Sequence, residues 1–220
     1  MRDPMRLSAI DHPNISQSVA AVIREMIVLG DLRDGDAINE VHLAAKLAVS
    51  RTPLREALSA LVGEQAVEHI PRRGFFVRGL TIEEATEIYA IRPLLEPEAL
   101  RTAGLPSPSE LDALDEINRQ FAAAPSARIA IALDDEWHAR LFSRTPNRTL
   151  IDILWHLIKR THRYELGVMG QPEVLESSAK GHREIIEALR NRDLARGCDL
   201  LKQNVSGLDA VVNWLESRRR

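Results

Sequence analysis

The chain has 220 residues, of which 45% are hydrophobic and 28% charged, a balance typical of soluble globular proteins. Its formal net charge is −3, with ten Lys/Arg and ten Asp/Glu up to residue 78, so overall charge gives no indication of nucleic-acid binding. No apolar run approaches the roughly 18 residues of a membrane span, the first residues lack the apolar segment of a secretion signal, and the single cysteine excludes an internal disulfide. We therefore expect a cytoplasmic protein without membrane contact.

Apolar periodicity predicts three helices in the first third of the chain. They lie at about residues 16–29, 40–47 and 51–62. Ser50 or Thr52 can cap the third helix, and Pro53 falls in its first turn, where a missing N–H costs little. Two short strands, AVEHI and FFVRG, then flank the turn PRRG. This order of elements, with two short helices joined by about three residues, is typical of a winged helix-turn-helix.

After residue 79 the sequence indicates helices throughout. We expect the first to be kinked or broken by Pro93 and Pro97, and the second to begin at a cap formed by Ser107. Further helices are expected at about residues 126–143, 148–165, 173–190 and 194–217. The predicted fold class is therefore mainly α, with a winged helix-turn-helix over residues 1–79 and an all-helical bundle over residues 80–220.

The start of the third helix carries side chains that suit recognition of a DNA duplex. Arg51 and Arg55 lie four residues apart and share one helix face, and the planar guanidinium of arginine matches the O6 and N7 atoms of guanine. The hydroxyls of Ser50 and Thr52, with the free N–H groups of the helix N-terminus, suit phosphate. The alternative is that both arginines are solvated surface charges beside acidic neighbours such as Glu56.

The turn between the two strands adds a second group of cations. Arg72 and Arg73 lie at the tip of the predicted hairpin, near the neighbouring DNA backbone or minor groove. From HLAAKLAVSRTPLREAL to RRGFFV, residues 16–78 resemble the winged-helix domain of GntR-type bacterial transcription regulators. The resemblance implies that Gly74 lets the hairpin, or wing, approach the DNA backbone closely.

The same resemblance implies that Arg51, Thr52 and Arg55 contact double-stranded operator DNA. Some members of the family carry a further contacting arginine early in the second helix, where this chain has Val41. We therefore expect Arg51, Arg55 and the wing arginines to carry an unusually large share of the binding.

In the helical half, the stretches DDEWH and GHREIIEAL contain candidate metal ligands. Asp134 and His138 lie four residues apart on one predicted helix face, and a carboxylate and an imidazole at this spacing can share a divalent metal. His182 begins another helical stretch. By spacing alone, a hydrogen-bonded Asp134–His138 pair and a capping or surface His182 remain alternatives.

Residues 81–217 resemble the FCD effector domain of the FadR subfamily of GntR regulators, in its compact VanR-type branch. The motifs IRPLLEPEAL, DDEWHARLF, GHREIIEAL and RDLARG follow one another in the expected order. In that family an Asp and three His residues often hold a metal at the floor of a ligand cavity. Asp134, His138 and His182 match three of these positions, and Asn204 stands at the fourth.

The resemblance therefore implies a divalent metal such as Zn, Ni or Mn. The Asn204 carbonyl is a weaker and harder donor than an imidazole, so this residue could ligate the metal or instead contact a water or the effector. A polar cavity floor that needs no metal is the alternative.

Arg92 matches a further family position, in the pattern RxxLE. A buried arginine can hold a carboxylate with two hydrogen bonds, so Arg92 and a metal would suit a small organic acid. The alternative role of Arg92 is a structural ion pair with Glu96, one helical turn further along.

The resemblance leads to one functional prediction and one alternative. The prediction is a homodimeric, ligand-responsive transcription regulator that binds operator DNA through residues 1–79 and a small carboxylate through residues 80–220. Repression relieved by the effector is the commoner mode of the family. The alternative is a metal-dependent enzyme in which Asp134, His138 and His182 hold a water-activating metal, although the sequence offers no placed general base.

Overall fold

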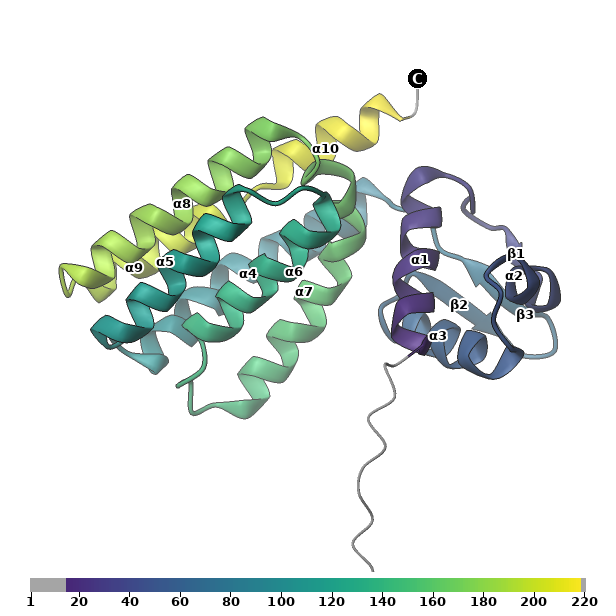
Figure 1. Cartoon of the computed structure of the whole chain (residues 1–220), viewed down its shortest axis with the longest axis horizontal. Helices are drawn as coiled ribbons and strands as arrows, with labels where there is room; N and C mark the ends of the chain where they lie inside the picture. The colour runs from purple at the N-terminus through teal and green to yellow at the C-terminus, as the bar shows by residue number, and fades with distance from the viewer. Residues whose placement is uncertain (1–14, 219–220) are drawn as a thin grey trace, which may run out of the picture.

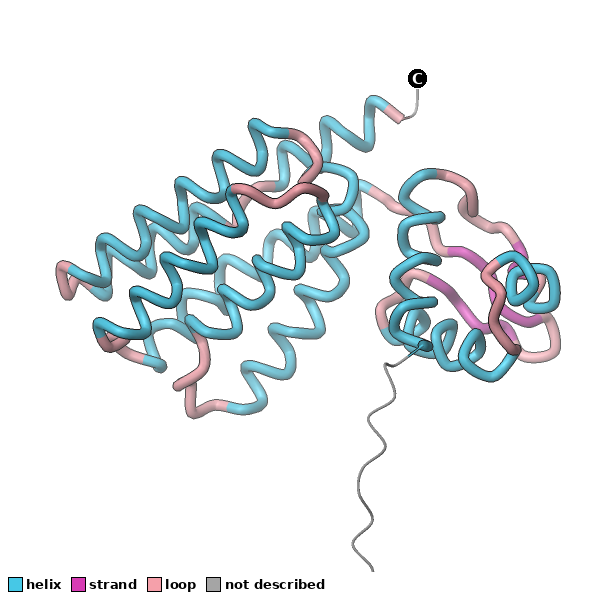
Figure 2. The backbone as a smooth tube through the Cα atoms, in the orientation of Figure 1, coloured by secondary structure: helices cyan, strands magenta, loops and turns pink. Residues whose placement is uncertain are grey.

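A computed structural model describes residues 15–218, which form two parts whose hydrophobic cores share no residue (Figure 1). The elements of the first part are α1 (Ile15–Leu29), β1 (Ala37–Ile38), α2 (Glu40–Lys46), α3 (Arg51–Gly63), β2 (Val67–Ile70) and β3 (Gly74–Val77). The strands form an antiparallel sheet in the order β1-β3-β2 (Figure 2). The winged helix-turn-helix predicted from the sequence is confirmed.

Strand β1 is an element that the sequence did not predict. It has only two residues, too few for a visible alternation of apolar and polar side chains. Ala37 pairs with Phe76, and next to this pair Val77 donates its N–H to the Asp36 carbonyl while Gly35 donates to the Val77 carbonyl. The strand thus attaches the wing to the turn that follows α1.

Helix α3 presents two different faces because its leucines recur at helical spacing. Leu54, Leu58 and Leu61 are fully buried and pack with Ile23 of α1 in the core of the first part. Burial of each such side chain contributes about 1.5–3 kcal/mol. The opposite face of α3, which carries Arg51 and Arg55, is exposed.

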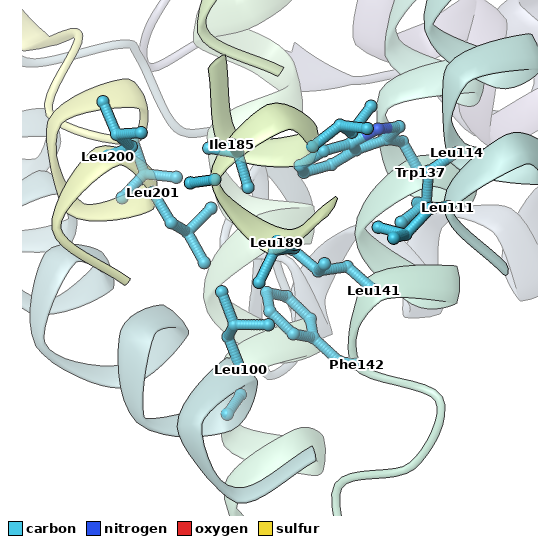
Figure 3. Close-up of a cluster of buried hydrophobic side chains, with 14 of the residues drawn as sticks. Leu100, Leu111, Leu114, Trp137, Leu141, Phe142, Ile185, Leu189, Leu200 and Leu201 are labelled. Atoms are coloured by element: carbon cyan, nitrogen blue, oxygen red, sulfur yellow. The ribbon is translucent and has the colours of Figure 1, made fainter. Parts of the chain in front are cut away.

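The second part is a helical bundle, as predicted. Its helices are α4 (Ile82–Ala103), α5 (Pro108–Ala122), α6 (Ala127–Leu141), α7 (Arg148–Val168), α8 (Pro172–Arg190), α9 (Leu194–Asn204) and α10 (Leu208–Ser217). The largest core cluster draws buried side chains from six of these helices, α4 to α9, including Leu100, Leu114, Trp137, Leu189 and Leu201 (Figure 3). Of the helices in residues 15–218, none is long and apolar enough to cross a lipid bilayer.

Two details of the bundle sharpen the sequence prediction. Of the kink or break expected at Pro93 and Pro97, the break is absent: α4 is one continuous helix, because packing of its buried face on α7 and α9 outweighs the two missing N–H groups. A single helix over 194–217 is wrong, since α9 ends at Asn204 and Gly207 precedes α10. The interruption allows α9 to pack on α8 and α4 while α10 packs on α4 and α7.

Candidate functional site

The N-terminus of α3 is open to a ligand. Ser50 occupies the N-cap position, but its side chain makes no capping hydrogen bond within the described residues. The first N–H groups of α3 therefore receive no hydrogen bond from the Ser50 side chain, and Pro53 has no N–H to satisfy. Such a helix end, with the positive end of the helix dipole, suits a phosphate group.

Arg51 and Arg55 extend from this helix end into solvent, with side chains 62% and 60% exposed. Their acidic neighbour is Glu40 of α2 rather than the expected Glu56. Arg55 Nε lies 2.7 Å from Glu40 Oε2, and Arg51 Nη2 lies 3.9 Å from the same oxygen. This contact could not be predicted from local spacing, because Glu40 lies on a different helix, 11 and 15 residues away. Glu40 holds the two guanidinium groups side by side but leaves them accessible to DNA.

The wing turn presents its cations at the surface. Arg72 and Arg73 are both exposed, and the Arg73 guanidinium lies over the Phe76 ring, 5.1 Å from its centroid. Gly74 has φ +95°, a conformation that favours glycine, and an added Cβ would meet no described atom within 4 Å. Gly74 is therefore required by the turn and leaves the backbone accessible. Val41, at the matching place of the second helix, is exposed and adds no charge.

In the bundle, three candidate metal ligands come together from two helices. Asp134 and His138 of α6 and His182 of α8 are buried, and one ligand atom from each lies within 4.8 Å of the others. His138 Nε2 is 3.6 Å from Asp134 Oδ2, and His182 Nε2 is 3.5 Å from Asp134 Oδ1. Asp134 Oδ1 and His182 Nε2 are buried without a hydrogen-bond partner in the described part of the chain. Such buried orphan atoms are rare unless an ion or water satisfies them.

A second layer of polar groups orients both imidazoles. His182 Nδ1 lies 3.1 Å from Asn118 Oδ1, and Asn118 is itself fixed because its Nδ2 donates to the Ala179 carbonyl. His138 Nδ1 lies 3.2 Å from Glu96 Oε2. Both Nε2 atoms consequently face Asp134, as in histidines that bind a metal through Nε2 while Nδ1 contacts a carboxylate or carbonyl. The donor set and its orphan atoms fit a divalent metal.

The protonation states of the cluster agree with a site for a cation. Burial raises the pKa of Asp134 to about 6, and the charge of His138 opposes this rise only in part. Burial and the nearby His138 hold the pKa of His182 well below its usual range, so His182 is a neutral donor at pH 7. A metal ligand must be deprotonated, and with a pKa of about 6 the Asp134 carboxylate meets this condition at pH 7, whereas a proton competes with a cation for it at lower pH.

Asn204 lines the same cavity as the cluster but has a protein partner. Its Nδ2 lies 3.3 Å from the Ser178 carbonyl of α8. Gly181 makes this arrangement possible, since a Cβ at that position would lie 2.3 Å from Asn204 Nδ2. Gly181 is a site residue that the sequence analysis missed, although it directly precedes His182.

The cavity above the cluster has a volume of about 470 Å³ and lies between α4, α6, α7, α8, α9 and α10. Arg92 of α4 lines it and forms the ion pair with Glu96 that the sequence offered as the alternative to ligand binding. Its Nε donates to Glu96 at 2.8 Å, and its Nη1 donates to Thr161 and Glu165 of α7, each at 3.1 Å. Of the guanidinium nitrogens, only Nη2 has no partner among residues 15–218, so a ligand finds one free nitrogen rather than two. Glu165 is a further cavity residue that the sequence analysis missed.

Comparisons with known proteins match both the winged helix-turn-helix and the helical bundle. The model of the bacterial regulatory proteins of the gntR family matches residues 15–77, and the FCD domain model matches residues 87–206. The chain belongs to the gntR family of regulators with an FCD domain. It is a DNA-binding, ligand-responsive transcription regulator, and the alternative of a metal-dependent enzyme receives no support from these matches.

Similar proteins include regulators that are named for an operon. The Nta operon transcriptional regulator of Aminobacter aminovorans is 36% identical over 61% of this chain and 66% of its own length. The gluconate operon transcriptional repressor of Bacillus licheniformis is 26% identical over 91% of this chain and 86% of its own length. A GntR family member from Pseudomonas syringae pv. tomato is 27% identical, with a TM-score of 0.55 over 93% of this chain and 87% of that chain. Escherichia coli McbR/YncC shares the fold, with a TM-score of 0.69 over 93% and 98% of the two chains at 21% identity.

Proposed function

We propose that this GntR regulator is a homodimeric repressor that releases operator DNA when a small organic acid enters the FCD cavity. Residues 1–79 form the DNA-binding domain and residues 80–220 the effector-binding and dimerisation domain, although residues 1–14 and 219–220 lie outside the described structure. The observation that carries the proposal is the cavity itself, which joins a metal-binding donor set to a buried arginine. Two relatives are named for the operons they regulate, so we also propose control of a single operon.

The DNA-binding surface consists of the open end of α3 and the wing. Ser50, Arg51, Thr52 and Arg55 supply hydroxyls, N–H groups and two accessible guanidinium groups. Arg72, Arg73 and Gly74 supply the exposed wing turn. This division matches winged helices in which one helix reads bases in the major groove while the flanking residues contact phosphate.

Operator binding is tested by fluorescence anisotropy with a duplex from the region upstream of the chain's own gene. We expect specific binding that weakens steeply between 50 and 200 mM salt, by on the order of 10³-fold if about six phosphates are contacted. Equal affinity for the upstream duplex and for a scrambled duplex of the same composition would contradict the proposal.

The effector site is proposed to contain a divalent metal held by Asp134, His138 and His182. Zn, Ni and Mn all accept such a donor set, and Asn204 lies close enough to the cavity to contact a water or the effector. A bound divalent cation would supply positive charge to a floor that already contains Asp134 and Glu165. A carboxylate effector would then contact this floor and the free Arg92 Nη2.

The metal and effector proposals are tested on the full chain purified without added metal. Elemental analysis should give close to one divalent metal per chain, either directly or after dialysis against Zn²⁺. Thermal denaturation with a panel of small mono- and dicarboxylic acids should then show stabilisation by a subset of them. A metal content near zero that Zn²⁺ does not restore would contradict the metal site, and a panel without effect would contradict the acid.

Exposed aliphatic side chains on the bundle are candidates for the dimer contact. Ile91 and Leu94, three residues apart on α4, are 42% and 65% exposed, and Ile153 of α7 is 50% exposed. Analytical ultracentrifugation should give a dimer for the wild-type chain and a weakened dimer for Leu94→Glu. A monomeric wild type at micromolar concentration would contradict the homodimer.

A further inference from the structure

Arg163 of α7 joins the bundle to the DNA-binding part through the backbone. Its side chain is 2% exposed, and its Nη1 donates to the carbonyl of Gln65 at 3.1 Å and to that of Arg78 at 3.4 Å. Its Nη2 contacts the carboxylate of Glu84 at the start of α4. One guanidinium group therefore binds residues on both sides of the boundary between the two parts.

The two carbonyls mark the ends of the elements that contact DNA. Gln65 directly follows the C-cap of α3. Its φ of +57° is a left-handed conformation, which is costly for any residue other than glycine. Arg78 directly follows β3 of the wing. Because Arg78 also donates its N–H to the Ala66 carbonyl, the ends of α3 and of the wing meet at Arg163. The position of Arg163 thus bears on the orientation of the recognition helix and the wing together.

The opposite face of the same helix segment contacts the cavity. Thr161 and Glu165 lie four residues apart on one face of α7, and both accept hydrogen bonds from Arg92. Arg163 lies about 200° around the helix from Thr161, since each residue turns by about 100°. A short stretch of one helix therefore holds the cavity arginine on one side and the DNA-binding part on the other.

Glu84 is held to α7 by residues other than Arg163 as well. Arg160 Nη2 donates to Glu84 Oε1 at 2.8 Å, and the Tyr164 hydroxyl donates to Glu84 Oε2 at 2.9 Å. Burial works to raise the pKa of Glu84, but the hydrogen bond from Arg160 and the charge of Arg163 together lower it, so the carboxylate is ionised. Arg160 contacts Glu84 without contacting the Gln65 or Arg78 carbonyls, which makes it a matched control for Arg163.

We propose that Arg163 is the coupling residue of this regulator: it transmits displacement of α7, caused by binding in the cavity, to α3 and the wing. The inference rests on the proposed function and adds the residue through which the two sites communicate. A packed helix shifts as a unit by about 1–2 Å in such transitions. Because Arg163 binds backbone carbonyls, no second flexible side chain lies between α7 and the DNA-binding part to absorb the shift. Coupling between the sites then requires the Arg163 guanidinium, whereas binding at each site does not.

The first test measures amide hydrogen exchange in the full-length chain. In Arg163→Met, peptides that cover residues 64–80 should exchange faster, on the order of tenfold, because two hydrogen bonds from a charged donor are lost. In Arg160→Met the same peptides should remain close to wild type. Unchanged exchange of residues 64–80 in Arg163→Met would overturn the proposal. Arg163→Lys, which keeps the charge near Glu84 but not the planar fork, replaces Arg163→Met if the latter does not fold.

The second test measures a property that a purely structural role would not change. DNA affinity is compared for metal-depleted and Zn²⁺-loaded protein, and we expect a shift of at least about fivefold for wild type and for Arg160→Met. Arg163→Met should bind the same amount of Zn²⁺ and show a shift below twofold. A full shift in Arg163→Met, or no shift in wild type that has bound Zn²⁺, would overturn the coupling. Absence of Zn²⁺ binding or of DNA binding would contradict the proposed function instead, and the exchange experiment then decides the role of Arg163.

Discussion

The N-terminal end of α3, which we propose binds DNA, and the cavity of the bundle hold their arginines in opposite environments. Arg51 and Arg55 are more than half exposed and share a single acidic neighbour, Glu40. Arg92 is 4% exposed and held by two buried carboxylates, Glu96 and Glu165. An exposed pair exchanges its partner for DNA at little cost, whereas a buried arginine is fixed before the ligand arrives. In the proposed function, the surface arginines would bind a large polyanion and the buried arginine would orient a small ligand.

The largest effect that would test this contrast is expected at Arg92. Arg92→Met removes the cation from two buried carboxylates, so the free energy of unfolding should fall by about 3–5 kcal/mol. Urea denaturation measures the change. Arg101→Met is the matched control, because Arg101 lies on the same helix in an exposed pair with Glu98, and its loss should cost at most about 1 kcal/mol. Equal effects of the two substitutions would mean that burial does not distinguish these arginines.

The second largest effect concerns the proposed metal ligands. Asp134→Ala should lower Zn²⁺ affinity at least about 100-fold, more than the loss of an outer-layer partner, because it removes the charged donor of the cluster. Competition with a chromophoric chelator measures the affinity. Asp135→Ala is the control, since Asp135 contacts His162 instead of the cluster. Retention of tight Zn²⁺ binding by Asp134→Ala would contradict the assigned ligands.

A smaller effect is expected at the recognition helix. Arg55→Ala should weaken operator binding by about 1–3 kcal/mol and change the free energy of unfolding by no more than about 0.5 kcal/mol, because the side chain is exposed. Anisotropy titrations and urea denaturation give the two values. Arg190→Ala, an exposed arginine of α8 that pairs with Asp112 and Asp115, should leave DNA affinity unchanged. If Arg55→Ala bound the operator like wild type, α3 would not be the reading helix.

The smallest effect is expected at Glu40, the acidic neighbour of Arg51 and Arg55. Glu40→Gln removes the carboxylate that competes with DNA for Arg51 and Arg55, so operator affinity should rise by about 0.2–1 kcal/mol. The gain should be largest at low salt, where surface electrostatics are least screened. A loss of affinity would show that Glu40 matters by holding the two side chains in position.

The sequence predicts those features whose determinants are local. The leucine spacing of α3 and the i, i+4 relation of Asp134 and His138 each lie within one helix, and the structure keeps both. The approach of His182 to Asp134 and His138 depends on a contact between side chains of α6 and α8. Only the resemblance to a family implied that these three residues come together. Local periodicity determines which face of a helix is apolar, but not which other helix covers it.

The features that the sequence missed are contacts between distant residues. Arg163 reaches Gln65 across 98 residues, and Arg92 reaches Glu165 across 73. Nothing in the spacing of charged residues distinguishes these from ordinary surface charges. The break between α9 and α10 was missed for a different reason: apolar residues continue at helical spacing on both sides of it, and one glycine is a weak signal.

That break has a consequence for how related chains can change their ligand. Residues 204–207 line the cavity where α9 ends and α10 begins, so one wall is a connection rather than the side of a helix. Connections accept insertions and substitutions at lower cost than packed helices do. We therefore expect changes in the 204–207 connection to alter most readily the size of ligand that the cavity accepts, while the proposed metal ligands and the core stay intact.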